Sequence, residues 1–309
     1  MDVDVDESGD EPLPAQVPVG RTGRITRAES RDSSTRNLKP TRDETAWGDH
    51  SGAGEHRHVG LLPTGRPARP PRTYPGYRRL VTLTVAHRFR GPSTSGNGGY
   101  VAGLVAARAG ATAGGSAAVV TLRSPPPLDT PLAVVADGDG AVRVVHGETV
   151  VAEGARSSLT VDPVPPVDRG TARSASADYA GLSAHPFPEC FVCGPERDPG
   201  DGLRLFPGRL GDGRTACVWT VDHDLAGRPE VVWAALDCPG GWSAEIEGRP
   251  MVLGRLTARV VTLPEAGEEC VVMGMLLGGE GRKTWTTTTA YGADGRELGR
   301  AHATWIAVS

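Results

Sequence analysis

Hydrophobic positions along the chain fall into two regions that repeat one order of predicted elements. Residues 81–85, Val-Thr-Leu-Thr-Val, alternate in the manner of a half-buried strand. The stretch 100–109 is apolar nearly all round, which predicts a buried helix. Strand-like runs follow at 118–123, 131–136, 141–146 and 149–161. One buried helix followed by an antiparallel sheet is an α+β unit.

The same order returns in the second half of the chain. A strand-like run at 214–221 precedes an apolar helix candidate at 230–236. Further strand-like runs follow at 251–263, 269–277, 283–291 and 297–308. The tetrapeptide Val-Val-Thr-Leu also occurs twice, at 119–122 and at 260–263. These features predict an internal duplication in which the two units pair as a pseudo-dimer, whose free sheet edges allow further association into a homo-oligomer.

The remaining segments set the expected domain boundaries. Residues 1–79 are rich in charged residues, Gly and Pro and show no periodic apolar spacing, which predicts a disordered N-terminal extension. A first repeat is expected at 80–164 and a second at 200–309. Between them, residues 165–199 form a linker that is rich in Pro, Ala and Ser and contains a Cys-x-x-Cys segment.

Composition narrows the classes of partner. The net charge of −4 and the sequence pI near 6.1 give no broad basic surface, so neither nucleic acid nor a membrane is expected as a partner. No apolar run approaches the roughly 20 residues that cross a bilayer, and the acidic start Met1–Asp6 is unlike a secretory signal. We therefore expect a cytoplasmic protein whose five cysteines are reduced thiols or metal ligands.

A glycine-rich turn directly before the first predicted helix is the first candidate for chemistry. The backbone amides of Gly98 and Gly99 follow Asn97 and lie at the positive end of the helix dipole, where no intrahelical acceptor exists. Such amides can stabilise a developing oxyanion. The alternative is that Asn97 only caps the helix and the glycines only relieve crowding.

Asp237 is the second candidate, because it is an acid within an apolar segment. Burial of an unpaired carboxylate is costly and would raise its pKa toward the range of a general base. The alternative is an exposed Asp at a helix end that Pro239 terminates. Trp233 and Trp242 flank Asp237 and either line a pocket or pack in the core.

The glycine-rich turn and the segment around Asp237 both resemble motifs of a known protein family. Residues 97–104, Asn-Gly-Gly-Tyr-Val-Ala-Gly-Leu, resemble the start of the central helix in hotdog-fold acyl-CoA thioesterases, where His replaces the Asn. The pair Leu236-Asp237 resembles the acidic position of that helix in the phenylacetate-pathway branch. The resemblance covers most of residues 81–309. It implies a tandem, or double, hotdog in which each half is an antiparallel sheet wrapped around a central buried helix.

Each half keeps only one part of the family's motif. The acid would stand nine residues after the turn, but that position holds Ala106 in the first half, and nine residues before Asp237 stands Arg228. In the family's dimers the turn of one subunit faces the acid of the other, so the resemblance implies one composite site. Its residues would be Asn97, Gly98, Gly99 and Asp237, with Tyr100, Trp233 and Trp242 as candidate pocket residues.

The resemblance implies a hydrolase that acts on acyl-CoA or another acyl thioester. The glycine amides would polarise the carbonyl, and Asp237 would activate water or attack directly. Pro239 just past the acid and Asn97 in place of His depart from the family's pattern. The alternative functions are a catalytically inactive hotdog protein that binds acyl thioesters and a zinc-stabilised interaction module.

The segment 190–194, Cys-Phe-Val-Cys-Gly, motivates the zinc alternative, because it has the form of half a zinc knuckle. A complete site needs further ligands, and three residues could supply them if the fold brings them close: His185, Cys217 and Cys238. A redox dithiol and a structural turn are the other interpretations. We expect no cofactor, with zinc at Cys190 and Cys193 as the alternative.

Overall fold

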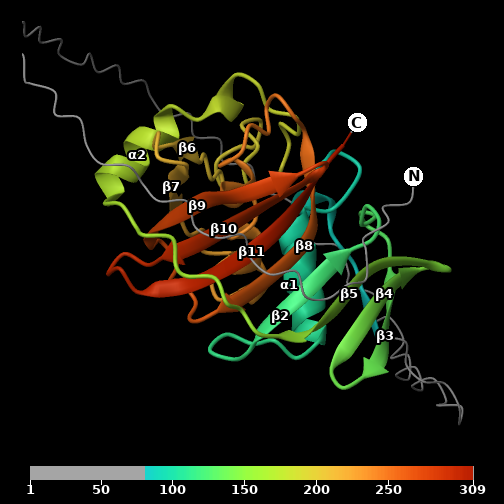
Figure 1. Cartoon of the computed structure of the whole chain (residues 1–309). Coiled ribbons are helices and arrows are strands. Elements are labelled where there is room, and N and C mark those ends of the chain that lie inside the picture. The colour runs from blue at the N-terminus through green and yellow to red at the C-terminus, as the bar shows by residue number, and fades with distance from the viewer. Residues whose placement is uncertain (1–80, 309) are drawn as a thin grey trace, which may run out of the picture. The chain divides into compact units, whose positions relative to one another are not determined.

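One antiparallel sheet forms the framework of the described part of the chain (Figure 1). The computed structural model describes residues 81–308, so the extension expected at 1–79 lies outside the described residues. The strands are β1 (Val81–Leu83), β2 (Ala117–Leu122), β3 (Leu132–Gly138), β4 (Ala141–His146), β5 (Thr149–Ser157), β6 (Gly208–Arg209), β7 (Arg214–Thr220), β8 (Met251–Val260), β9 (Glu269–Glu280), β10 (Lys283–Tyr291) and β11 (Glu297–Ala307).

The order of strands across the sheet is nearly symmetric. It runs β1-β3-β4-β5-β2-β8-β11-β10-β9-β7-β6. From one edge, β1-β3-β4-β5-β2 leads to the centre. From the other edge, after the two-residue strand β6, β7-β9-β10-β11-β8 does so in the same pattern. The two sets join through antiparallel β2 and β8, where Val120 pairs with Leu256. The strands expected from sequence are confirmed, with ends that differ by a few residues.

The helices are few. They are α1 (Gly98–Arg108), α2 (Arg169–Ala177), α3 (Pro229–Ala235) and α4 (Cys238–Gly241), with 3₁₀ turns at His87–Phe89 and Ala180–Leu182. The helix α1 contacts β2, β5 and β8 as well as α3, and most of its residues are buried. None of the helices within residues 81–308 has the length and apolar character needed to cross a membrane.

The stretch expected to be a linker, 165–199, contains the helix α2, which corrects that expectation. Asp168 caps it by accepting a hydrogen bond from the Thr171 amide at 3.0 Å. Ala172 and Ala175 lie one turn apart and are buried in a small cluster with residues of β7 and β9. The helix was missed because its buried face consists of alanines, which give little hydrophobic contrast to the serines between them.

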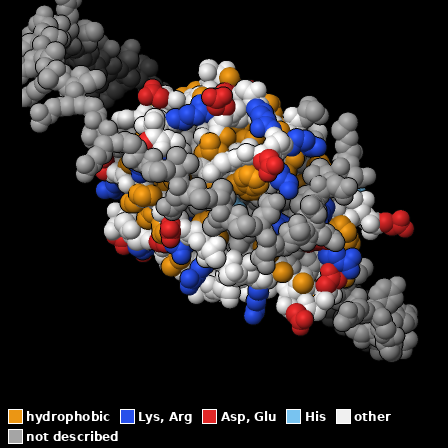
Figure 2. All heavy atoms as spheres, viewed as in Figure 1, with side chains coloured by type: hydrophobic (Ala, Val, Ile, Leu, Met, Phe, Trp, Pro, Cys, Tyr) orange, Lys and Arg blue, Asp and Glu red, His pale blue; other side chains and the backbone are white. Residues whose placement is uncertain are grey.

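Charged side chains of both signs are interspersed on the face shown in Figure 2.

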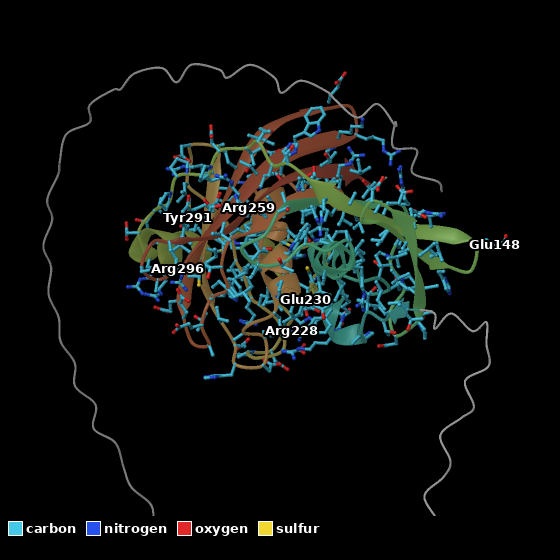
Figure 3. All side chains as sticks on the ribbon, turned by 90° about the horizontal axis from the view of Figure 1, so that it is seen from below. Glu148, Arg228, Glu230, Arg259, Tyr291 and Arg296 are labelled. Carbon is cyan, nitrogen blue, oxygen red and sulfur yellow. The ribbon has the colours of Figure 1, made fainter. Side chains whose placement is uncertain are left out.

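At the start of α3, the Arg228 Nε lies 3.0 Å from the Glu230 Oε1, and both residues are labelled in Figure 3. Arg228 also donates a hydrogen bond of 2.7 Å to the Tyr100 hydroxyl on α1. These contacts tie the start of α3 to α1.

Two glycines on α1 allow the close approach of α3. A Cβ at Gly103 would lie 2.6 Å from the Glu230 Cα, and a Cβ at Gly99 would lie 2.8 Å from the Trp233 carbonyl oxygen. Both distances are shorter than real Cβ contacts, so any side chain at these positions would force the two helices apart. The close contact also helps to position Asp237, because α3 ends just before this residue.

Gly103→Ala tests this packing. Helix propensity alone would favour Ala by about 1 kcal/mol, but the clash with backbone atoms of Glu230 is expected to reverse the sign. We expect a net loss of about 1–3 kcal/mol in the free energy of unfolding, measured by urea denaturation. Gly248→Ala is the matched control, because the nearest atom to its added Cβ would be 3.8 Å away. Equal stability of both variants would contradict the packing account.

Candidate active site

Asp237 occupies the junction between α3 and α4. Helical hydrogen bonding ends at Leu236, and Asp237 leaves the helical conformation with φ −84° and ψ −82°. Pro239 then stands in the first turn of α4, where its missing N–H costs nothing. The Asp237 side chain is only 2% exposed, so the alternative of an exposed acid at a helix end is wrong.

Two donors from the first half of the chain hold one oxygen of this carboxylate. The Asp237 Oδ2 accepts hydrogen bonds from the Asn97 Nδ2 at 3.0 Å and from the Gly99 N–H at 2.9 Å. The Asn97 Oδ1 in turn accepts from the Tyr100 N–H at 2.9 Å and caps α1. Because Asn97 uses its oxygen on the helix and its nitrogen on the acid, both ends of its amide are oriented.

The other carboxylate oxygen of Asp237 differs from Oδ2 in its hydrogen bonding. Its Oδ1 is buried and has no hydrogen-bond partner within residues 81–308. Burial raises the pKa of Asp237 to about 7, and the bonds from Gly99 and Asn97 oppose that rise. A buried polar atom without a partner is costly, and such atoms concentrate where a ligand or a reaction uses them.

A cavity of about 420 Å³ adjoins Asp237. Asn97, Gly98 and Asp237 contribute to its lining, together with apolar side chains from β2, β8, β11 and neighbouring turns: Leu122, Met251, Leu253, Trp242, Trp305 and Ile306. The volume falls in the usual range for small-molecule pockets, which are mostly apolar with a few polar groups. The apolar walls suit an acyl chain or a small ring.

The two glycine amides have different roles. The Gly99 N–H is already engaged by Asp237, so the expectation that it polarises a substrate carbonyl needs correction. The Gly98 N–H is the first of the helix and has no acceptor in the described part of the chain. Gly98 also lines the cavity. The amide of Gly98 is therefore the candidate donor to a ligand in the cavity.

Only one of the three aromatic residues expected in the pocket lines the cavity. Trp242 does so. Tyr100 instead stacks on Phe89, with ring centroids 3.9 Å apart, and is 4% exposed. Trp233 is buried where α3 crosses α1 and also lies outside the cavity. Placing Tyr100 and Trp233 in the pocket was therefore wrong, because α1 and α3 turn these rings toward the core.

The cysteines form a cluster next to Asp237. The sulfurs of Cys190, Cys193 and Cys238 all lie within 4.8 Å of one another, and all three residues line the cavity. His185 also lines it, with its Nε2 3.3 Å from the Cys193 Sγ, and burial lowers the pKa of this imidazole. Cys217 is buried elsewhere, on β7, and does not belong to the cluster.

Sequence reasoning missed the apolar walls of the cavity. Met251 and Leu253 alternate along β8, and Trp305 and Ile306 lie near the end of β11. Alternation identifies the buried face of a strand, but it does not say which part of that face borders a cavity rather than the core. That distinction depends on the turn at 122–126 and the loop at 185–193, which complete the lining.

No protein-family model matches the sequence, and no curated protein matches it. Similar solved structures include a conserved hotdog-fold protein of unknown function from Alicyclobacillus acidocaldarius, with 12% identity and a TM-score of 0.47, covering 77% of this chain and 95% of the other. A Novosphingobium aromaticivorans protein, provisionally described as a thioesterase, has 13% identity and a TM-score of 0.49, with 74% and 95% covered. The smu.793 protein of Streptococcus mutans UA159, bound to acetyl CoA, has 12% identity and a TM-score of 0.29, with 31% and 82% covered.

Hotdog-fold and thioesterase-like proteins are thus among the structures to which this chain is similar. The large antiparallel sheet with few helices fits that fold.

Asn97→Ala tests the double role of this side chain. The variant removes the cap of α1 and one donor to a buried carboxylate, so we expect a loss of about 2–4 kcal/mol in unfolding free energy. Asp168→Ala is the control for a cap alone, since Asp168 caps the exposed start of α2, and about 1 kcal/mol is expected there. Asn97→Ser keeps a capping oxygen and should fall between them. Equal losses for Asn97→Ala and Asp168→Ala, measured by urea denaturation, would contradict a role beyond capping.

Proposed function

We propose that the chain is a tandem hotdog hydrolase of acyl thioesters with one composite site between its two halves. The symmetric strand order supports the tandem arrangement, because each half contributes one five-stranded pattern and one helix that packs in the interior. The turn at Asn97 belongs to the first half and Asp237 to the second. Only their combination gives a held carboxylate beside a free helix-terminal amide.

The observation that carries the proposal is the unequal use of the two oxygens of Asp237. Its Oδ2 is held by Asn97 and Gly99, whereas its Oδ1 has no partner within residues 81–308, in a residue that lines the cavity. A carboxylate that served only to join α1 and α3 would gain stability from donors to both oxygens. The free oxygen is the one that a water molecule or a thioester carbonyl carbon would meet.

The chemistry follows from these positions. The thioester carbonyl oxygen would accept a hydrogen bond from the Gly98 N–H, which stabilises the negative charge that forms during attack. Asp237 would either take a proton from an attacking water or attack the carbonyl carbon itself and form an anhydride that water then hydrolyses. In both routes the thiolate leaves and the carboxylic acid is released. The acyl group would lie in the apolar cavity.

Coenzyme A is the acyl carrier that the family resemblance favours. Arg282 lies among the lining residues of the cavity, together with Arg123, which is paired with Glu153 at 2.8 Å. A carrier with phosphate groups would find positive charge there.

Asp237→Asn provides the direct test. The amide keeps the shape of the side chain and one oxygen that can accept from Asn97 and Gly99, but it is a far weaker base and nucleophile, so kcat for an acyl-CoA panel should fall about 10²–10⁴-fold. Asp178→Asn, at the exposed end of α2, is the matched control and should keep wild-type rates. Hydrolysis that is unaffected by Asp237→Asn would contradict the proposed role of this residue.

A catalytically inactive binding protein is the alternative that the same assay separates. If no ester of the panel is hydrolysed by the wild-type protein, calorimetry with a non-hydrolysable acyl-CoA thioether measures whether the cavity still binds one. Binding without turnover would favour the alternative, in which Asn97 in place of the family's His marks the loss of catalysis.

A further inference from the structure

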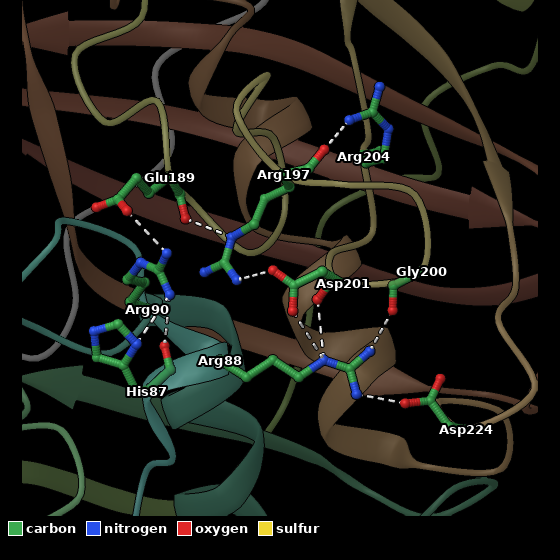
Figure 4. Close-up of polar contacts among 9 residues, drawn as sticks. All are labelled: His87, Arg88, Arg90, Glu189, Arg197, Gly200, Asp201, Arg204 and Asp224. Carbon is green, nitrogen blue, oxygen red and sulfur yellow. Dashed lines mark hydrogen bonds and ion pairs between the residues drawn. The ribbon is translucent and has the colours of Figure 1, made fainter.

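The loop that carries Cys190 and Cys193 is held in a defined position. The segment from Ser183 to Pro207 has no helix or strand, and irregular segments of such length are uncommon in compact domains unless they are functional. Figure 4 shows how arginines fix it. Arg90 pairs with Glu189 at 2.9 Å, and Arg88 donates to the Gly200 carbonyl at 2.8 Å.

A buried arginine continues this network inside the loop. Arg197 is 3% exposed, and its Nε donates to the Glu189 carbonyl at 2.7 Å while its Nη1 pairs with Asp201 at 2.6 Å. On the other side of the loop, Phe191 packs edge-on against the Phe89 and Tyr100 rings. The backbone around Cys190 is therefore fixed by contacts that do not involve its sulfur.

The sulfur atoms of this loop meet a third one from a distant segment. The Sγ atoms of Cys190 and Cys238 are 3.8 Å apart, and Cys193 Sγ lies within 4.8 Å of both. In a tetrahedral zinc centre with Zn–S bonds of about 2.3 Å, neighbouring sulfurs are about 3.8 Å apart. All three cysteines are at least nine-tenths buried.

Hydrogen-bond donors lie around the Cys190 sulfur in particular. The Asn97 Nδ2 lies 3.8 Å from the Cys190 Sγ, and the backbone amides of Val192 and Cys193 also interact with that sulfur. A run of amides directed at the first sulfur of a Cys-x-x-Cys-Gly turn is the arrangement that a metal-bound thiolate needs.

The alternative interpretation of the sulfur cluster is that three reduced thiols only pack in the core. Cys217 and Cys270 are examples of cysteines that pack in the core of this protein. Each is buried on a strand, and neither belongs to the sulfur cluster. Convergence of three sulfurs from two segments, at the spacing of a metal centre, is not needed for packing.

We propose that Cys190, Cys193 and Cys238 bind one zinc ion through their three sulfurs, with the fourth position taken by water from the adjoining cavity. His185 is not assigned as the fourth ligand, because its Nδ1 accepts the Phe187 N–H at 2.9 Å. The neutral imidazole then carries its proton on Nε2, which donates to Cys193 at 3.3 Å. Binding releases the three thiol protons to solvent. The ion would join the loop to α4, whose first residue follows Asp237.

Metal analysis of the full chain tests this site independently of any enzymatic activity. Protein purified in reducing buffer without chelator should contain about one zinc ion per chain by mass spectrometry. Cys238→Ser should lower this content at least about ten-fold. Cys217→Ser is the matched control, a buried cysteine outside the cluster, and should keep the wild-type content. His185→Gln should retain the metal, and its loss there would overturn the assignment of the three-sulfur ligand set.

Cobalt substitution covers the case in which Cys238→Ser does not fold. Co²⁺ added to metal-free wild-type protein should give strong near-ultraviolet absorption from sulfur–cobalt bonds, and an equivalent of zinc should remove it. Wild-type protein that contains no zinc and gives no such absorption would overturn the proposal. So would a chain mass lower by two hydrogens after purification, which would show a disulfide among these cysteines.

Discussion

The carboxylate of Asp237 is buried at the contact between α1 and α3, where its hydrogen-bond donors must come from the protein itself. They come from Asn97 and Gly99, at the start of α1, and reach only one of its two oxygens. This contact exists because Gly99 and Gly103 have no side chains to separate the helices. This hydrogen-bonded carboxylate is therefore the interaction that links the two halves of the chain at the helix crossing, next to the cavity.

The two halves are not equivalent in what they bring to this interaction. The first supplies a helix start with a capping amide and two glycines, and the second supplies an acid at a helix end followed by Pro239. A third segment, the loop at 185–193, adds His185 and two cysteines to the cavity. The lining of the cavity thus combines segments that a single repeat does not contain.

Much of this could be predicted from the sequence, because alternation marks strands and an all-apolar run marks a buried helix. The strands of both halves belong to that part, whereas the meeting of Asp237 with the turn at Asn97 is expected only from the resemblance to hotdog thioesterases. The helix α2 could not be predicted, since its buried face is made of alanines. Nor could the directions of Tyr100 and Trp233, or the meeting of Cys238 with Cys190, because these depend on how helices and loops pack rather than on local pattern.

A crystal structure of the Asp237→Asn variant with a bound acyl-CoA tests the central claim most directly. The account predicts that the acyl group occupies the cavity bounded by Leu253 and Trp242. It also predicts that the thioester oxygen accepts a hydrogen bond of about 2.9 Å from the Gly98 N–H, with the side chain at position 237 next to the carbonyl carbon. An acyl group bound outside this cavity, or a carbonyl directed away from Gly98, would contradict it.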